Sequence, residues 1–235
     1  MFPRTHSVQV RGSLTGADAI KGAQITVWSA LVTHVAAGPG RPRLVEQRRR
    51  GATAREEIRD AAAELFTTRG YAGTSTRMIA EAVGIRQASL YHHFKTKDDI
   101  LESLLKDTVV APLEKAREVA AADGPTLARL QELAGFDAGQ LAASRWNLGA
   151  LYLLPELRTQ RFAEFRQART DLARIYAQLA GEVLGDQSDP RRHVPFRLVE
   201  SVISMRSDEM VGALGSDSLD DLVGVLVESI ALVLT

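Results

Sequence analysis

Apolar residues recur with the period of an α-helix along most of the chain after residue 53. The first stripe follows Thr53-Ala54-Arg55-Glu56, a capping-box pattern with Thr at the N-cap and Glu three residues later. Gly70 stands where a residue with positive φ commonly ends a helix. We therefore predict a helix from residue 54 to residue 69. Its apolar face, at positions i, i+3, i+4, i+7 and i+8, consists of Ile58, Ala61, Ala62, Leu65 and Phe66.

Two short helices and a longer one are predicted next. Thr74-Ser75-Thr76 supplies the N-cap of a second helix, which Gly84 ends. A third helix spans about 87–93. A fourth begins near Lys97 and is expected to kink or split at Pro112. Three helices with a Gly between the second and the third describe a helix-turn-helix, here at residues 75–94.

The rest of the chain is also predicted to be helical. The pattern gives helices at 125–143, 144–154, 156–184, 193–213 and 217–234, separated by Pro and Gly breaks. No strand-like alternation of useful length follows residue 50. The last helix is apolar nearly all round, so we expect a domain core on one side and a second subunit on the other. The fold class predicted is all-α.

Residues 1 to about 50 differ from everything that follows. They hold scattered Gly and Pro and show no helical period, so we predict a disordered N-terminal extension over residues 1–51. One interpretation is that a misassigned start adds upstream codons, with Val45 as the alternative start. Another is a basic arm, Arg41 to Arg50, that enters the DNA minor groove. The two are compatible if the arm is limited to residues 48–50.

Composition and charge narrow the function without deciding it. The 235 residues carry 29 Lys+Arg and 29 Asp+Glu, which weighs mildly against DNA binding. From Arg41 to Lys106, however, there are 13 basic and 9 acidic residues. The chain has no cysteine, no apolar run long enough for a bilayer and none of the common hydrolase, nucleotide-binding or metalloprotease motifs. We expect a cytoplasmic protein that is not an enzyme and has no cofactor or membrane partner.

The third predicted helix presents a polar outward face. With about 100° per residue, Leu90 and Phe94 share the inward face, while Ala88 and His92 lie opposite. Small side chains there let the backbone approach base edges or a thymine methyl group. The adjacent pair His92 and His93 cannot chelate a metal from one helical face, so we expect no metal site.

The segment from Thr53 to about Pro112 resembles the DNA-binding domain of the tetracycline-repressor (TetR) family. The run Leu90-Tyr91-His92-His93-Phe94 followed by Lys95-Thr96-Lys97 carries the resemblance most specifically, together with Thr74-Ser75-Thr76-Arg77 and Gly84-Ile85. The resemblance implies a three-helix helix-turn-helix domain at 52–112, followed by a helical ligand-binding and dimerisation domain at 113–235. It further implies a homodimer that pairs through the last two helices.

The resemblance also implies roles for individual residues at the DNA. Thr76 and Arg77 would touch phosphates or an adjacent base edge, and Lys97 would pair with a phosphate. Arg86 occupies a position where a Ser N-cap is common in the family; Arg caps poorly, and a phosphate or a guanine are alternative contacts. The recognition helix would meet bases through Gln87, Ala88 and Ser89 and hold the DNA backbone through Tyr91, His92 and His93.

The implied function is that of a repressor released from a palindromic, double-stranded operator by a small-molecule effector. A pocket in the second domain would combine large apolar surface with a few polar groups. For each single residue the alternative is ordinary core packing. A DNA-binding protein without a small ligand, acting in nucleoid organisation or through a protein partner, is the competing hypothesis. The candidate pocket residues are Phe136, Trp146, Asn147, Tyr152 and Phe165.

Overall fold

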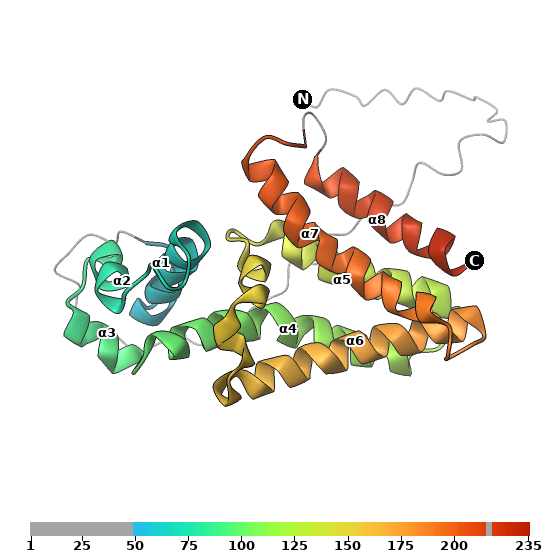
Figure 1. Cartoon of the computed structure of the whole chain (residues 1–235), viewed down its shortest axis with the longest axis horizontal. Helices are drawn as coiled ribbons and strands as arrows, with labels where there is room; N and C mark the ends of the chain where they lie inside the picture. The colour runs from blue at the N-terminus through green and yellow to red at the C-terminus, as the bar shows by residue number, and fades with distance from the viewer. Residues whose placement is uncertain (1–48, 215–217) are drawn as a thin grey trace, which may run out of the picture. The chain divides into compact units, whose positions relative to one another are not determined.

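The computed structural model describes residues 49–214 and 218–235, all within one compact unit, Val45–Thr235. These residues form helices and no strand, which confirms the all-α prediction (Figure 1). Apart from positions 49–51, the predicted N-terminal extension lies outside the described residues. The elements are α1 (Ala54–Arg69), α2 (Thr76–Val83), α3 (Gln87–His93), α4 (Lys97–Ala121), α5 (Thr126–Ala143), the 3-10 turns η1 (Leu148–Leu153), η2 (Pro155–Arg158) and η3 (Gln160–Phe162), α6 (Ala163–Leu184), η4 (Pro190–His193), α7 (Val194–Met210) and α8 (Leu219–Leu234).

Local capping explains where α1, α2 and α4 begin and where α2 ends. The predicted capping box of Thr53 and Glu56 is present at α1, and Ser75 caps α2 by accepting from the backbone N–H of Met78. Gly84 has φ 78° and ψ 30°, the left-handed conformation that lets the chain reverse between α2 and α3. A second capping box, Thr96 with Asp99, opens α4.

One buried core holds α1, α2 and α3 on the first part of α4. Ile58, Ile79 and Leu90 are fully buried, one from each of the first three helices. Ile100 and Leu101 of α4 are equally buried against them. A side chain of this size contributes about 1.5–3 kcal/mol when it leaves water. Helices α2 and α3, of 8 and 7 residues, therefore depend on this core, because neither is long enough to be stable alone.

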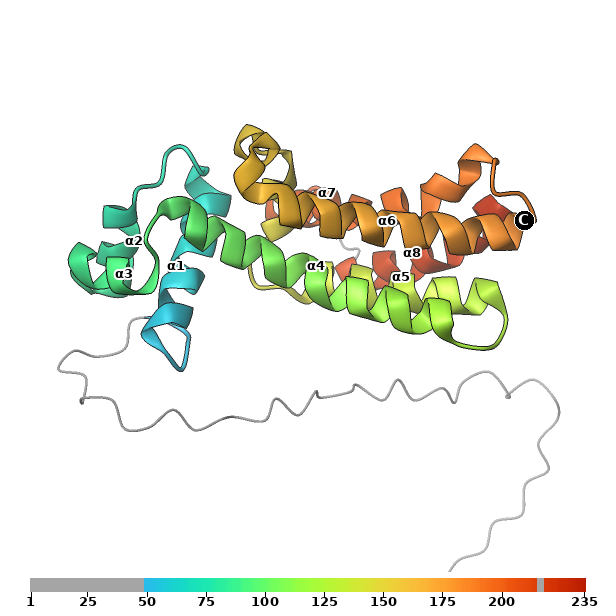
Figure 2. The ribbon, with the colours of Figure 1, turned by 90° about the horizontal axis from the view of Figure 1, so that it is seen from below.

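Helix α4 continues from this core into a second bundle formed with α5–α8 (Figures 1 and 2). There α4 packs against α5 and α6, and α5 packs against α7 and α8. The predicted kink or split at Pro112 does not divide the helix, which is continuous from Lys97 to Ala121. No helix among the described residues has both the length and the apolar character to cross a bilayer.

The predicted helix 144–154 is the largest difference from the sequence analysis. Residues 144–147 form a loop and Leu148–Leu153 a 3-10 turn, so α6 begins only at Ala163. The buried Arg206 of α7 explains the loop, because its guanidinium donates to the carbonyl oxygens of Leu141, Ser144 and Trp146. These acceptors are thereby satisfied without a continued helix.

A buried carboxylate lies in the second bundle. Asp137 of α5 is 4% exposed and accepts a hydrogen bond from the hydroxyl of Tyr176, 3.2 Å away. Burial raises the pKa of Asp137 to about 7; the hydrogen bond from Tyr176 lowers it and the charge of Glu200 raises it. The folded chain therefore keeps this proton between about pH 3.9, where an unfolded aspartate releases it, and about pH 7. The contribution of this group to stability falls as the pH rises through that interval.

We predict that Asp137→Asn raises the thermal midpoint by several degrees at about pH 8 and changes it little at about pH 4.5. The amide keeps an acceptor for Tyr176 and removes the charge that must be buried above pH 7. Thermal unfolding followed by circular dichroism at both pH values measures this, with the exposed Asp123→Asn as control. An increase that does not depend on pH would contradict the prediction.

Candidate nucleic-acid interface

Helices α2 and α3 form a helix-turn-helix from the N-cap Ser75 to the C-cap Phe94, with Leu90 and Phe94 buried as the periodicity predicts. Three side chains of the predicted DNA surface hydrogen-bond to one another. The Gln87 amide donates to the Thr76 hydroxyl at 3.0 Å and to the Tyr91 hydroxyl at 3.3 Å. The Thr76 and Tyr91 hydroxyls are 3.1 Å apart. We call these three residues the polar triad.

The remaining predicted contact residues of α3 lie around the triad. Ala88, His92 and His93 are exposed, and Ser89 is half-buried. Tyr91 is 45% exposed, although its hydroxyl is hydrogen-bonded within the triad; a large aromatic side chain is more often buried. Arg86, the N-cap of α3, is exposed and makes no side-chain cap hydrogen bond, as its chemistry predicts. The face is therefore polar, accessible and free of bulky apolar side chains other than Tyr91.

The predicted phosphate ligand Lys97 has an additional structural task. Its ammonium donates to the carbonyl oxygens of Tyr71, at 2.9 Å, and Thr74, at 3.0 Å. It also lies 4.0 Å from the centre of the Tyr71 ring, a cation–π contact. Burial and then the Asp98 carboxylate, which accepts from the Tyr71 hydroxyl, raise the pKa of Tyr71. Lys97 thus holds the turn that leads into α2 while keeping its positive charge close to α2.

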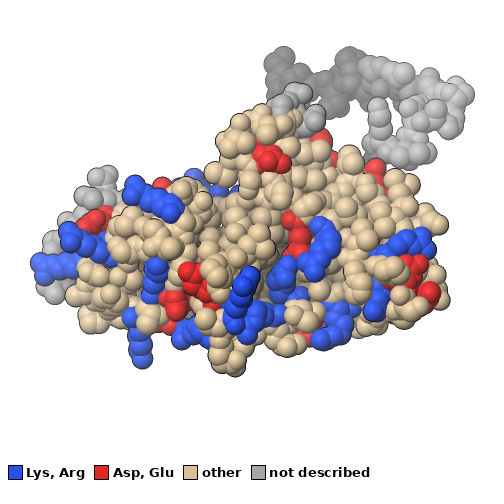
Figure 3. All heavy atoms as spheres, viewed as in Figure 1, with Lys and Arg blue, Asp and Glu red and all other residues tan. Residues whose placement is uncertain are grey.

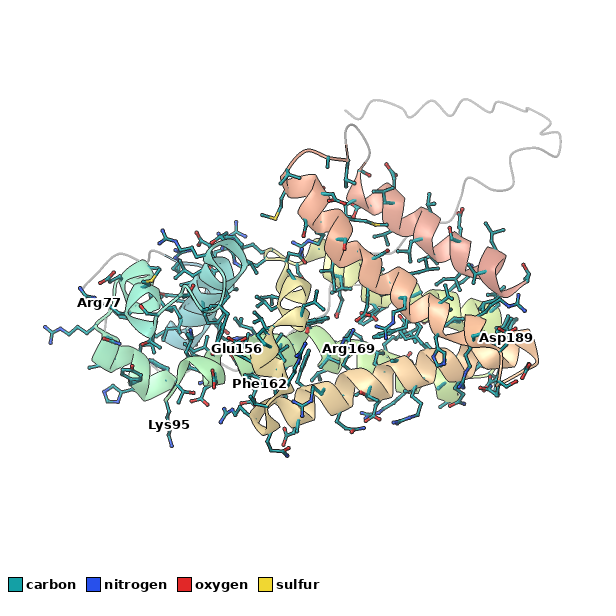
Figure 4. All side chains as sticks on the ribbon, in the orientation of Figure 1. Arg77, Lys95, Glu156, Phe162, Arg169 and Asp189 are labelled. Carbon is teal, nitrogen blue, oxygen red and sulfur yellow. The ribbon has the colours of Figure 1, made fainter. Side chains whose placement is uncertain are left out.

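Several basic side chains near this face are already paired. Arg77 forms an ion pair with Glu81 at 2.8 Å, and Arg49 pairs with Glu64 and donates to the carbonyl of Ala82. Arg49 is therefore held against α1 and α2 and does not extend freely as part of a basic arm. Lys and Arg side chains nevertheless protrude over α2 and α3 (Figure 3), and Arg77 and Lys95 point away from the helices (Figure 4).

Comparison with known proteins places this geometry in a family. Residues 58–104 match the profile of "Bacterial regulatory proteins, tetR family". The crystal structure of AmtR from Mycobacterium smegmatis is 54% identical, with a TM-score of 0.73, over 80% of this chain and 89% of AmtR. The chain belongs to the TetR family. Members of this family are DNA-binding transcriptional regulators and not enzymes.

Curated TetR-family relatives match over a shorter stretch of the chain. The transcriptional repressor KstR2 from Rhodococcus jostii is 39% identical over 79 residues, which are 34% of this chain and 39% of KstR2. The negative transcriptional regulator IcaR from Staphylococcus aureus is 44% identical over 52 residues, 28% of its length. These matches thus span well under half of the length of each relative.

The candidate pocket residues of this TetR-family chain do not converge on one site. Tyr152 and Phe165 are neighbours, with ring centres 5.5 Å apart, and both line one cavity. Burial raises the pKa of Tyr152 to about 12, and its hydroxyl lies 2.7 Å from that of Thr108. Trp146 lines a different cavity, of about 300 Å³. Asn147 is buried and donates to the carbonyl of Ile203, whereas Phe136 is 38% exposed on α5.

Two sets of contacts between the DNA-binding helices and the second bundle were not predicted. Asp60 of α1 accepts from Arg145 at 2.7 Å and from the indole N–H of Trp146 at 3.1 Å. Arg161 of η3 forms ion pairs with Asp99 and Glu102 at the start of α4. We call these the Asp60 contact and the Arg161 contact. Their partners are distant in sequence, so helical periodicity offers no signal for them.

The burial of Arg206, which positions residues 144–146, could have been predicted from the sequence. Arg206 falls in the register of the buried residues Val199 and Val202, at i+7 and i+4 from them. A charged side chain at a core position predicts a dedicated set of hydrogen-bond partners. Asp137 of α5 occupies such a position as well.

We predict that Lys97→Met lowers the free energy of unfolding by about 1–2 kcal/mol, because two carbonyl groups lose their donor and the Tyr71 ring loses its cation. Urea unfolding measures the change. The neighbouring exposed variant Lys95→Met serves as control and should stay within about 0.5 kcal/mol of the wild type. Equal midpoints for the two variants would mean that the turn does not depend on Lys97.

Proposed function

We propose that this chain is a homodimeric repressor that binds a palindromic operator through α2 and α3 and is released by a small molecule in its second bundle. The polar triad of Thr76, Gln87 and Tyr91 is the observation that carries the proposal. Three side chains with both donors and acceptors are oriented by one another before DNA arrives, so binding costs less side-chain entropy.

Within this proposal, the residues of the two helices divide their tasks at the DNA. Gln87, Ala88 and Ser89 meet base edges in the major groove, because they lie at the start of α3. Phosphates are contacted by Thr76, Arg77, Tyr91, His92, His93 and Lys97. Lys97 donates to two carbonyls, which leaves one of its three N–H donors for a phosphate.

The exposed surface of α7 and α8 supports the homodimer. Leu232 and Val225 of α8 are 81% and 60% exposed, and Val211 after α7 is 78% exposed. The surface over these helices seen in Figure 3 carries few Lys or Arg side chains. Exposed apolar area of this kind mostly marks a protein interface. A two-fold pair places two copies of α3 in successive major grooves, which doubles the contacts with a palindrome.

Release by a small molecule follows from a shift between two forms of the dimer. The Asp60 and Arg161 contacts fix how α1 and α4 sit on the second bundle, and with them the position of α3. A ligand that binds better when these contacts are altered lowers the population of the DNA-binding form. The ligand can change the free-energy difference between the two forms only by as much as its binding free energies to them differ.

The first experiment is DNase footprinting of the purified full chain on the DNA upstream of its own gene, with a salt titration. We expect one protected palindrome whose half-sites are about one helical turn, roughly 34–36 Å, apart. The logarithm of the binding constant should fall linearly with the logarithm of salt concentration.

Gln87→Ala is the matched variant, because it removes the centre of the polar triad and leaves every charge in place. We expect it to relax the preference at particular base pairs by about 1–3 kcal/mol without altering the salt dependence. Equal weakening on all sequences would contradict base recognition by Gln87. A single protected half-site would contradict the dimeric operator.

We predict that Leu232→Glu raises the dimer dissociation constant by about 100-fold or more. The interface of each dimer would then bury two charged glutamate side chains in place of two leucine side chains. Sedimentation velocity over a concentration series measures it. Leu153→Glu changes a leucine that is 90% exposed in η1, outside α7 and α8, and serves as control. Unchanged dimerisation in Leu232→Glu would move the interface away from this part of α8.

A further inference from the structure

A cavity of about 280 Å³ lies between η1, η2 and the first turns of α6. Its apolar wall is formed by Tyr152 and Phe165, whose rings are tilted at 51° to each other, together with Leu157. Its polar lining is unusual: it contains Arg158, Arg166 and Arg169 and no carboxylate. An aromatic wall facing three guanidinium groups fits a ligand that is apolar at one end and anionic at the other.

The positive charges at this cavity are only partly compensated by the chain itself. Arg169 pairs with Glu200, but the same carboxylate also pairs with Arg197. The guanidinium of Arg166 donates to two backbone carbonyl groups, of Leu157 and Thr159, which leaves its charge unneutralised. Within residues 49–214 and 218–235, the Arg158 guanidinium has no hydrogen-bond or ion-pair partner.

Arg169 is the best-positioned of the three. It extends from α6 (Figure 4), and its guanidinium lies 5.4 Å from the centre of the Tyr152 ring and 5.5 Å from that of Phe196. Its Nε is buried and, among the described residues, has no hydrogen-bond partner. Arg169 therefore offers the cavity a positive charge beside an aromatic ring, a setting that favours an anionic group on the ligand.

We propose that this cavity binds a small organic carboxylate with an apolar body, held by Arg158, Arg166 and Arg169 and packed on Tyr152 and Phe165. The proposal rests on the proposed function and names the chemical class of its effector. A carboxylate matches the planar fork of a guanidinium, and the rings offer a face for an apolar or aromatic group.

The position of the cavity connects it to the DNA-binding helices. Arg158 ends η2, and the following turn, η3, carries Arg161, whose ion pairs reach Asp99 and Glu102 of α4. A carboxylate that draws Arg158 and Arg166 inward pulls on the segment between them, which contains η3. The Arg161 contact is thereby displaced at the start of α4, next to Lys97 and the turn that it holds.

The test uses 3-phenylpropanoate, which combines a carboxylate with one phenyl ring, and isothermal titration calorimetry of the full-length dimer. Two matched probes separate the contribution of the apolar body to binding from that of the charge. The alcohol 3-phenylpropan-1-ol keeps the apolar body without the charge, and inorganic phosphate keeps a charge without the apolar body. We expect binding of the carboxylate at least about tenfold tighter than that of either probe. Equal binding of the alcohol, or no binding of the carboxylate, would overturn the proposal.

Variants then place the bound molecule. We expect Arg169→Met to weaken binding of 3-phenylpropanoate about 10- to 100-fold, as for the loss of a charged hydrogen bond. Arg158→Gln changes an exposed side chain that has no partner among the described residues, so it tests the same cavity if Arg169→Met unfolds. Arg174→Gln is the control, because Arg174 lies on the same helix, pairs with Asp171 and does not line the cavity. Equal weakening by Arg174→Gln would overturn the assignment to this cavity.

Footprinting with added ligand separates this proposal from the function on which it rests. We expect 3-phenylpropanoate, and not the alcohol, to release the wild type from its operator, and to release Arg169→Met only at higher concentration. Calorimetric binding with an unchanged footprint would overturn the effector role and leave operator binding intact. A missing footprint without ligand would instead count against the proposed function, while the calorimetry still tests the cavity.

Discussion

One helix, α4, spans the hydrophobic core from α1 to the second bundle, and the rest of the structure depends on this constraint. Its first turns, with Ile100 and Leu101, complete the core of the helix-turn-helix, and its later turns, with Val109 and Leu113, belong to the second bundle. Packed cores have discrete arrangements and resist gradual deformation. A change in the second bundle that moves α4 must therefore move α1–α3 with it, which makes α4 the mechanical link between any effector and α3.

The contacts beside α4 differ in kind from those within it. The Asp60 and Arg161 contacts are ion pairs and hydrogen bonds with half-exposed partners, so each contributes modestly to stability and is easily exchanged for water. Arg206 ties residues 144–146 to α7, and Arg145 and Trp146 tie the same loop to Asp60. Helix α7 is thus joined to α1 through one loop of polar contacts. Apolar packing sets the fold, while these weaker contacts set the orientation of α1.

The sequence predicts those parts of the structure that local rules determine. It does not predict contacts between side chains that are distant in sequence. Thr53, Gly84 and the inward pair Leu90 and Phe94 follow from capping, left-handed conformation and helical period. Residues 144–154 carry a helical pattern, yet Arg206 binds carbonyl groups that such a helix would need. The register of Arg206 predicts that it is buried and has partners, but not which groups these are. The candidate DNA contacts lie on one surface because one short helix carries most of them. The candidate pocket residues scatter, because large apolar side chains occur in every part of a core and do not define a cavity.

Charge pairing within the DNA-binding helices has a consequence for how the operator is bound. Arg77 is paired with Glu81 and Arg59 with Asp107, and two of the donors of Lys97 are used by the turn. Arg86 and Lys95, by contrast, are exposed and form no ion pair among the described residues, so they are available for phosphates. Phosphate contacts supply most of the non-specific affinity of a DNA-binding protein, so these two side chains would contribute to it. In the proposed complex, two copies of these cations and of the polar triad would contact one operator, so recognition and dimerisation would depend on each other.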